Sequence, residues 1–144
     1  MNSAATTHHK NKTLTTLLAV FLGGIGVHRF YLHGAKDFWA WNYLIAFILF
    51  ASAAFLARST DTLTITLLAL FPASIFAGWI EAIVTGLTAD AQWDARHNAH
   101  SRRKSSSGWP LIVLLVITFG LGITTFIFCV ARATDIFLTG GAFG

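Results

Sequence analysis

The sequence WPLIVLLVITFGLGITTFIFCVA, from Trp109 to Ala131, contains 23 consecutive residues without a charge. About 20 apolar residues in a helix span the hydrocarbon core of a bilayer, which is roughly 30 Å thick. This stretch therefore predicts a membrane-spanning helix. Two earlier stretches predict the same, because residues 38–57 carry no charge and residues 63–87 carry only Glu81.

The composition agrees with a membrane protein. Of the 144 residues, 55% are hydrophobic and 11% are charged, whereas a soluble domain has about 25% charged residues. The mean hydropathy is +0.65. These values exclude a disordered chain and argue against an ordinary soluble domain. The net charge of +4 comes from basic residues between apolar blocks, which favours topology signals and headgroup contacts over nucleic-acid binding.

The first apolar block is shorter than the others. Residues 13–27 follow a polar segment, 1–12, and carry no charge. At about 1.5 Å per residue they reach only about 22 Å. No small-residue cleavage site follows, so we interpret this block as a retained helix and not as a signal peptide. We expect it to extend to residue 32, with Arg29 reaching the headgroups.

Together these blocks predict an all-α, multi-pass integral membrane protein with about four transmembrane helices in a small bundle. Three helices is the alternative if the first block is only half inserted. The expected helices cover residues 13–32, 38–57, 63–87 and 109–131. A polar basic loop, 88–108, precedes the last helix. The tail, 132–144, is too short and too rich in glycine to span a bilayer.

The orientation of a four-helix arrangement follows from its Lys and Arg residues. Four lie on the side of both termini, and six lie in the 28–37 and 88–108 loops. This bias predicts that those two loops are cytoplasmic and that both termini are outside. Aromatic residues also gather toward the loop side: Tyr31, Trp39, Trp41, Trp93 and Trp109. They either anchor the protein at the interface or form a one-sided surface for a partner or for lipid headgroups.

Glu81 is an acid at membrane depth. Ala69, Ala73 and Ala77 precede it at four-residue spacing, which places all four on one helix face. Small residues let helices approach closely, so we expect this face to point into the bundle. Arg29 or His28 is the expected partner of Glu81. The pair either fixes packing or serves a proton or ion relay.

Other polar residues give weaker indications of chemistry. Asp94, His97 and His100 have a spacing that a metal site uses, but neighbouring basic residues oppose a cation and no fourth ligand is evident. Cys129 is the single cysteine, which excludes an internal disulfide. We therefore predict no catalytic residue, no metal and no cofactor. A membrane enzyme that uses His28 or His33 is a minor alternative.

The sequence LGGIGVHRFYL, residues 22–32, resembles the hallmark of the transmembrane-two domain family, which includes the bacterial NINE-type membrane proteins. Two later stretches, WIEAI at 79–83 and WDARHN at 93–98, are similar to positions that follow in bacterial members. The resemblance covers roughly residues 12–98 and makes 38–62 look like an inserted helix and turn. It implies a functional motif at Gly23, Gly24, Gly26, His28, Arg29, Phe30, Tyr31 and Gly34. It implies a secondary motif at Trp93, Asp94, Arg96 and Asn98.

The sequence therefore predicts a small membrane protein that acts by interaction and has no enzymatic activity. We expect the His28–Tyr31 turn to be presented to a protein or lipid partner. The expected location is the bacterial plasma membrane, and the expected partners are the lipid bilayer and a membrane protein or a second copy of the chain. The alternative is an oligomeric transporter of ions, protons or small solutes that uses Glu81.

Overall fold

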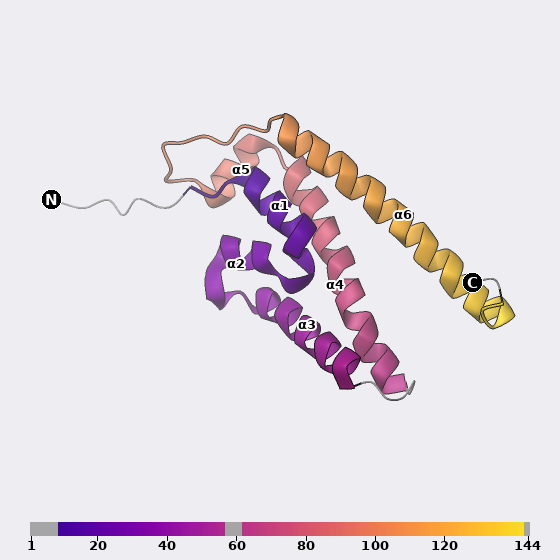
Figure 1. Ribbon diagram of the computed structural model, residues 1–144. Coiled ribbons are helices and arrows are strands. Elements are labelled where there is room, and N and C mark those ends of the chain that lie inside the picture. The colour runs from indigo at the N-terminus through magenta and orange to yellow at the C-terminus, as the bar shows by residue number, and fades with distance from the viewer. Residues whose placement is uncertain (1–8, 57–61, 143–144) are drawn as a thin grey trace.

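A computed structural model describes residues 9–56 and 62–142, and every regular element in these ranges is helical. Figure 1 shows their arrangement. In chain order they are α1 (Lys12–Leu22), η1 (Gly23–Ile25), α2 (Val27–His33), η2 (Gly34–Lys36), α3 (Phe38–Leu56), α4 (Thr62–Leu87), α5 (Asp90–His97) and α6 (Trp109–Thr139). The fold is the small all-α membrane bundle that the sequence predicts. Residues 1–8 of the expected polar segment and most of the expected 58–62 turn lie outside the described ranges.

Three described helices are long and apolar enough to cross a bilayer: Phe38–Leu56, Thr66–Leu87 and Trp109–Thr139. The apolar stretch Lys12–Ile25 is shorter. The three-helix alternative therefore describes the structure better than four full spans. The tail prediction was wrong in one respect, because α6 continues through Arg132 and Asp135 to Thr139. Those two side chains form an ion pair within the helix.

The single helix expected at 13–32 is broken in two. α1 ends at Leu22, and Gly26 adopts a left-handed conformation with φ of 80°. A Cβ atom at Gly26 would lie 2.7 Å from Cβ of Tyr43, so space as well as backbone conformation requires glycine here. The break turns the chain back, and α1, η1 and α2 form a helical hairpin (Figure 1).

The hairpin changes the expected topology. Lys10 Nζ donates to the carbonyl of Tyr31 at 2.6 Å, and Lys12 Nζ donates to the carbonyl of Thr88 at 2.5 Å. The start of α1, the end of α2 and the end of α4 therefore lie at one end of the molecule, called here the basic end. Since α6 leads away from this end to its C-cap at Gly140, residue 9 and the end of α6 lie on opposite sides. For the described residues, this arrangement departs from the expectation that both termini share one side.

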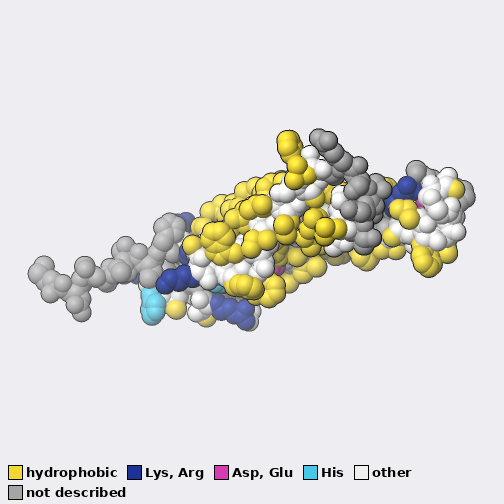
Figure 2. All heavy atoms as spheres, turned by 90° about the horizontal axis from the view of Figure 1, so that it is seen from below, with side chains coloured by type: hydrophobic (Ala, Val, Ile, Leu, Met, Phe, Trp, Pro, Cys, Tyr) yellow, Lys and Arg dark blue, Asp and Glu magenta, His cyan; other side chains and the backbone are white. Residues whose placement is uncertain are grey.

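The charge distribution becomes one-sided as a result. Of the nine Lys and Arg residues in the described ranges, only Arg132 lies toward the far end of α6. The other eight lie at the basic end: Lys10, Lys12, Arg29, Lys36, Arg96, Arg102, Arg103 and Lys104. Figure 2 shows this gathering of Lys, Arg and His beside a predominantly hydrophobic middle.

Small residues on α4 allow two other helices to approach it. The buried positions are Ser74, Gly78, Ala82 and Gly86, again at four-residue spacing. A Cβ at Gly78 would lie 2.7 Å from Cα of Gly23, and one at Gly86 would lie 2.5 Å from Leu115. The small-residue face is therefore shifted by one residue from the expected alanine face, of which Ala69 and Ala73 are exposed. Gly78 lets the backbones of α4 and η1 meet, and Gly86 leaves space for the side chain of Leu115.

Candidate functional site

Glu81, on α4, receives hydrogen bonds from two other helices. Its Oε2 lies 2.6 Å from Nε2 of His28. Nε and Nη2 of Arg29 donate to Oε1 at 3.1 and 3.0 Å, and the hydroxyl of Tyr43 on α3 donates to the same oxygen at 2.9 Å. The predicted pairing of Glu81 with Arg29 and His28 is confirmed. Sequence analysis missed Tyr43, whose only signal is its position in the first turns of an apolar block.

Arg29 also binds a second carboxylate. Its Nη1 lies 3.2 Å from Oδ2 of Asp37, and Nδ1 of His33 lies 3.4 Å from the same oxygen. Asp37 directly precedes α3, and its Oδ1 accepts from the backbone N–H of Trp39 at 3.1 Å. One guanidinium thus joins the hairpin to the start of α3 and to α4. Asp37 was not among the predicted site residues.

The motif side chains make contacts within the molecule that hold the hairpin in place. His28 is only 1% exposed, and its Nδ1 has no hydrogen-bond partner among the described residues. Phe30 packs edge-on against Trp41 with ring centroids 5.5 Å apart. The hydroxyl of Tyr31 accepts from the backbone N–H of Asn11 at 3.0 Å. The expectation of a presented His28–Tyr31 turn is wrong for His28, because the short helix α2 turns this side chain inward.

The four glycines of the motif have separate roles. Gly23 lies against Gly78, and Gly24 lies against Phe71 and Ile75 of α4. Gly26 makes the turn. Gly34 ends α2 with φ of 72° and has open space around it. The sequence allowed either close packing or a helix break at these glycines. Gly23 and Gly24 serve close packing, and Gly26 serves the break.

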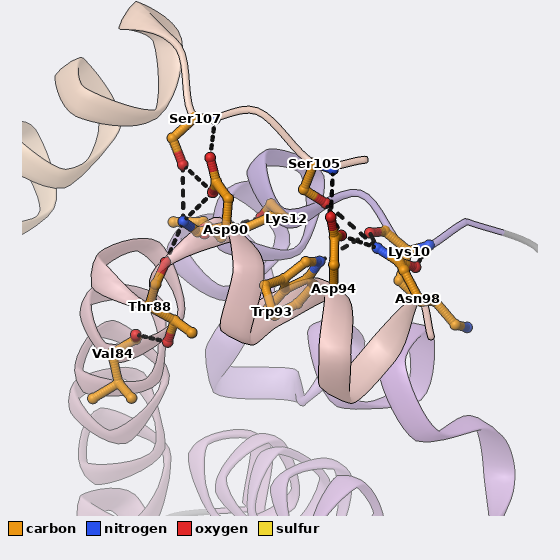
Figure 3. A network of polar contacts seen from close by, with 11 residues as sticks. Lys10, Lys12, Val84, Thr88, Asp90, Trp93, Asp94, Asn98, Ser105 and Ser107 are labelled. Atoms are coloured by element: carbon orange, nitrogen blue, oxygen red, sulfur yellow. Dashed lines mark hydrogen bonds and ion pairs between the residues drawn. The ribbon is translucent and has the colours of Figure 1, made fainter. Parts of the chain in front are cut away.

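Three residues of the secondary motif fasten the chain before α1 (Figure 3). Nε1 of Trp93 and Nδ2 of Asn98 both donate to the carbonyl of Lys10 at 3.1 Å. The backbone N–H of Lys10 donates to Oδ1 of Asn98 at 2.7 Å. Asp94 accepts from Asn98 at 3.0 Å and from the hydroxyl of Ser105 at 2.6 Å. These bonds lower the pKa of Asp94 to about 2.

Lys12 extends the same network toward α6. It is 6% exposed, and its Nζ binds Asp90 at 2.8 Å and the hydroxyl of Ser107 at 2.8 Å. Hydrogen bonds from Lys12 and Ser107 lower the pKa of Asp90. We call this network the N-terminal clasp, and its members are Lys10, Lys12, Asp90, Trp93, Asp94, Asn98, Ser105 and Ser107. Sequence analysis missed its lysines and serines, which join segments about 80 to 95 residues apart.

A cavity of about 370 Å³ lies beside the Glu81 cluster. Glu81 and Arg29 form part of its wall, and Leu32, Val84 and Trp93 supply apolar surface. His33, Arg96 and His97 also line it, from α2 and α5. Arg96 is therefore not part of the clasp, although the sequence grouped it with Trp93, Asp94 and Asn98.

The metal interpretation of Asp94, His97 and His100 has no support in the geometry. Asp94 is engaged by Asn98 and Ser105, and the ring of His97 stacks on Trp93 at a centroid distance of 4.3 Å. Burial lowers the pKa of His97, and the positive charges of His33, Arg96 and Lys10 lower it further. In the described part of the chain, no three His, Cys, Asp or Glu residues gather as a metal site would need.

Residues 8–57 match the family model of the TM2 domain. Over this stretch, about a third of the chain, the sequence is similar to the TM2 domain. The match covers the hairpin and α3. In the sequence, residues 38–62, which contain α3, looked like an inserted helix and turn. Glu81 lies outside the matched residues yet binds three side chains within them, and the wider region to residue 98 stays a prediction. No curated protein and no solved structure matches the chain.

Proposed function

We propose that this TM2-domain protein is a non-enzymatic interaction component of the bacterial plasma membrane, and that its basic end binds an acidic partner protein. A strongly basic surface recognises acidic partners through complementary charge. The apolar helices and the TM2 domain support its place in a membrane. The partner and the type of membrane are parts of the proposal.

The proposal rests on the gathering of basic residues at one end of the molecule, on segments that the N-terminal clasp holds in place. The N-terminal clasp ties Lys10 to α5, Lys12 of α1 to Ser107, and Ser105 to Asp94 of α5 (Figure 3). Because the helical hairpin returns, eight of the nine described Lys and Arg residues lie at this end. Cytoplasmic loops of membrane proteins carry such an excess, which supports a cytoplasmic basic end.

The proposed contact residues are Arg102, Arg103 and Lys104. All three are exposed, and none forms an ion pair with another described residue. The clasp holds the following serines, so the basic residues stand on an anchored loop. His28 and Arg29 take a structural part in this proposal, since their side chains hold Glu81.

The transport alternative has less support. Both carboxylate oxygens of Glu81 already accept hydrogen bonds from His28, Arg29 or Tyr43. A carboxylate held by an arginine must break those bonds before it binds a migrating ion or proton. We therefore propose that Glu81 stabilises the arrangement of α2, α3 and α4.

Crosslinking in native membranes tests the interaction proposal. Wild type is compared with Arg102→Gln, Arg103→Gln, Lys104→Gln combined, and co-purifying proteins are identified by mass spectrometry. We expect an acidic partner that the neutral variant loses. The control variant Arg102→Lys, Arg103→Lys keeps the charge and should keep the partner. Equal capture by the neutral variant would contradict the proposal, and so would a partner whose contact surface is not acidic.

A further inference from the structure

A second cavity lies about one helical turn along α4 from the cavity beside Glu81, which we call the polar cavity because Arg29, Glu81 and Arg96 line it. It is a groove of about 220 Å³ between α4 and α6, where the two helices diverge in Figure 1. Its lining is almost wholly apolar and includes Phe76, Trp79, Ile80, Phe119 and Phe126. α4 reaches the basic end at Leu87, so these positions lie deeper in the hydrocarbon region than the polar cavity.

One exposed face of α4 connects the two cavities. Ile80, Val84 and Leu87 are spaced by four and three residues, which places them on one helix face. They are 62%, 62% and 71% exposed. Val84 lines the polar cavity and Ile80, one turn deeper, lines the apolar groove. A ligand that crosses this face therefore reaches a polar cavity with one end and an apolar groove with the other.

The polar cavity has an available cation. Glu81 and Asp37 share the charge of Arg29, so Arg29 is not free to bind an added anion. Arg96 is exposed and forms no ion pair with a described residue. His33 and His97 lie beside it, with ring centroids 6.1 Å apart. A guanidinium and neighbouring imidazoles have N–H groups that can donate hydrogen bonds to phosphate oxygens.

We propose that one phospholipid with an anionic headgroup binds here, with its phosphate in the polar cavity near Arg96 and an acyl chain in the groove between α4 and α6. A helix of a partner protein, about 10 Å across, does not fit a groove of 220 Å³. A soluble phosphate ion would use the polar cavity alone and leave the groove without a role. The cytoplasmic leaflet supplies anionic lipids at this depth.

The test uses the full chain, purified in detergent and analysed by native mass spectrometry with added lipid. Phosphatidylglycerol is compared with phosphatidylcholine of the same acyl chains. Arg96→Gln removes the proposed phosphate contact, and Arg102→Gln removes an exposed arginine outside the cavity. Gly122→Leu fills the groove, because a Cβ at Gly122 points within 3.6 Å of Trp79. Gly120→Leu is its control on the same helix, since a Cβ there meets nothing within 4 Å.

We expect one phosphatidylglycerol per chain, bound in preference to phosphatidylcholine. Loss of one charge-assisted contact should weaken binding roughly tenfold in Arg96→Gln, with little change in Arg102→Gln. Gly122→Leu should also reduce occupancy, whereas Gly120→Leu should not. Thermal unfolding of each variant in the absence of lipid shows whether it is folded, and a destabilised Gly122→Leu is replaced by Gly122→Ala, which narrows the groove less.

Three results would overturn the site. Equal loss in Arg96→Gln and Arg102→Gln would show general attraction by the basic end. Equal binding of the two lipids would remove the role of the anionic headgroup. Displacement of the lipid by an excess of glycerol 3-phosphate or inorganic phosphate would identify a site for free phosphate. The acidic-partner proposal rests on Arg102, Arg103 and Lys104, so each proposal fails separately.

Discussion

At the scale of single residues, Arg29 and Gly26 decide most of the local geometry. Arg29 binds Glu81 and Asp37, which lie 52 and 8 residues away in the chain. Its planar guanidinium offers several donors in fixed directions, so one side chain can hold two carboxylates. Gly26 turns the chain so that α2 brings Arg29 to these partners. Substitution of Gly26 or of Glu81 should therefore reduce the stability of the protein.

Gly26→Ala should destabilise the protein more than Gly140→Ala. Both glycines are left-handed, with φ of 80° and 71°, and a left-handed alanine costs about 1–2 kcal/mol. Only at Gly26 would the new Cβ lie 2.7 Å from another side chain. Thermal unfolding in detergent checks the difference. Equal losses would show that Tyr43 moves aside without penalty.

Glu81→Gln should lower the free energy of unfolding by about 2 kcal/mol, because it weakens hydrogen bonds that involve charged partners and leaves Arg29 with Asp37 alone. Asp135→Asn is the control, since its partially exposed pair with Arg132 is worth about 0–1 kcal/mol. Denaturant or thermal unfolding measures both variants. Unchanged stability in Glu81→Gln, together with ion or proton flux in wild-type liposomes that the variant loses, would favour the transport alternative.

At the scale of elements, the helices meet through glycine and are fastened through polar caps. The end of α1 is held on α4 where Gly23, the first residue of η1, meets Gly78. The start of α1 is held by Lys12, which donates to the carbonyl of Thr88 after α4. A lysine suits this place because helix C-termini carry free carbonyls and partial negative charge. The two contacts hold α1 on α4 at its beginning, through Lys12, and at its end, through Gly23.

Gly78→Ala should separate α1 from α4. The added methyl group would lie 2.7 Å from the backbone of Gly23, which neither helix relieves without moving, and such overpacking costs about 1–3 kcal/mol. Gly120→Ala changes the same residue type where nothing lies within 4 Å, and it should cause no loss. Thermal unfolding of the two variants decides this, and equal stability would contradict the close approach.

The clasp should weaken in acid. The pKa of Asp94 is about 2 in the folded protein against an ordinary value of 3.8. A lowered carboxyl pKa stabilises the fold above the ordinary value, and the contribution is lost as pH falls from about 3.8 toward 2. Asp94→Asn should remove this part of the pH dependence. Unfolding temperatures of wild type and variant at pH 5 and below measure it, and parallel curves would contradict the assignment.

At the scale of the whole molecule, the described residues contain three helices that are long and apolar enough to cross a membrane: α3, α4 and α6. We expect these three to span it, while the hairpin of α1 and α2 returns to the side on which it began. The basic end therefore faces one side and the end of α6 faces the other. Of the nine described basic residues, eight lie at the basic end and one toward the other end, whereas a four-span arrangement would divide the same nine six against three. The hairpin therefore gives a stronger orientation signal.

Site-directed labelling tests this topology. In a Cys129→Ser background, Ser106→Cys and an N-terminal tag should be accessible from the same side, and a C-terminal tag from the opposite side. Ser106 is exposed, so labelling needs no unfolding. A membrane-impermeant thiol reagent and antibody access in oriented vesicles provide the measurement. Both tags on one side would restore the four-span arrangement.

The sequence by itself determined the membrane class, the helical fold, the TM2 resemblance and two partners of Glu81, His28 and Arg29. Those conclusions follow from the length of the apolar stretches and from the cost of an unpaired charge in a bilayer. Neither depends on whether the chain crosses the membrane or turns back. The reversal at Gly26, the small-residue face at Gly78 and the clasp through Lys10 and Lys12 came only from the tertiary structure. Glycine permits both a packed helix and a turn, and the space left by Tyr43 and α4 selects the turn. The side on which the N-terminal segment lies depends on that one choice, because a hairpin returns the chain where a straight helix would cross.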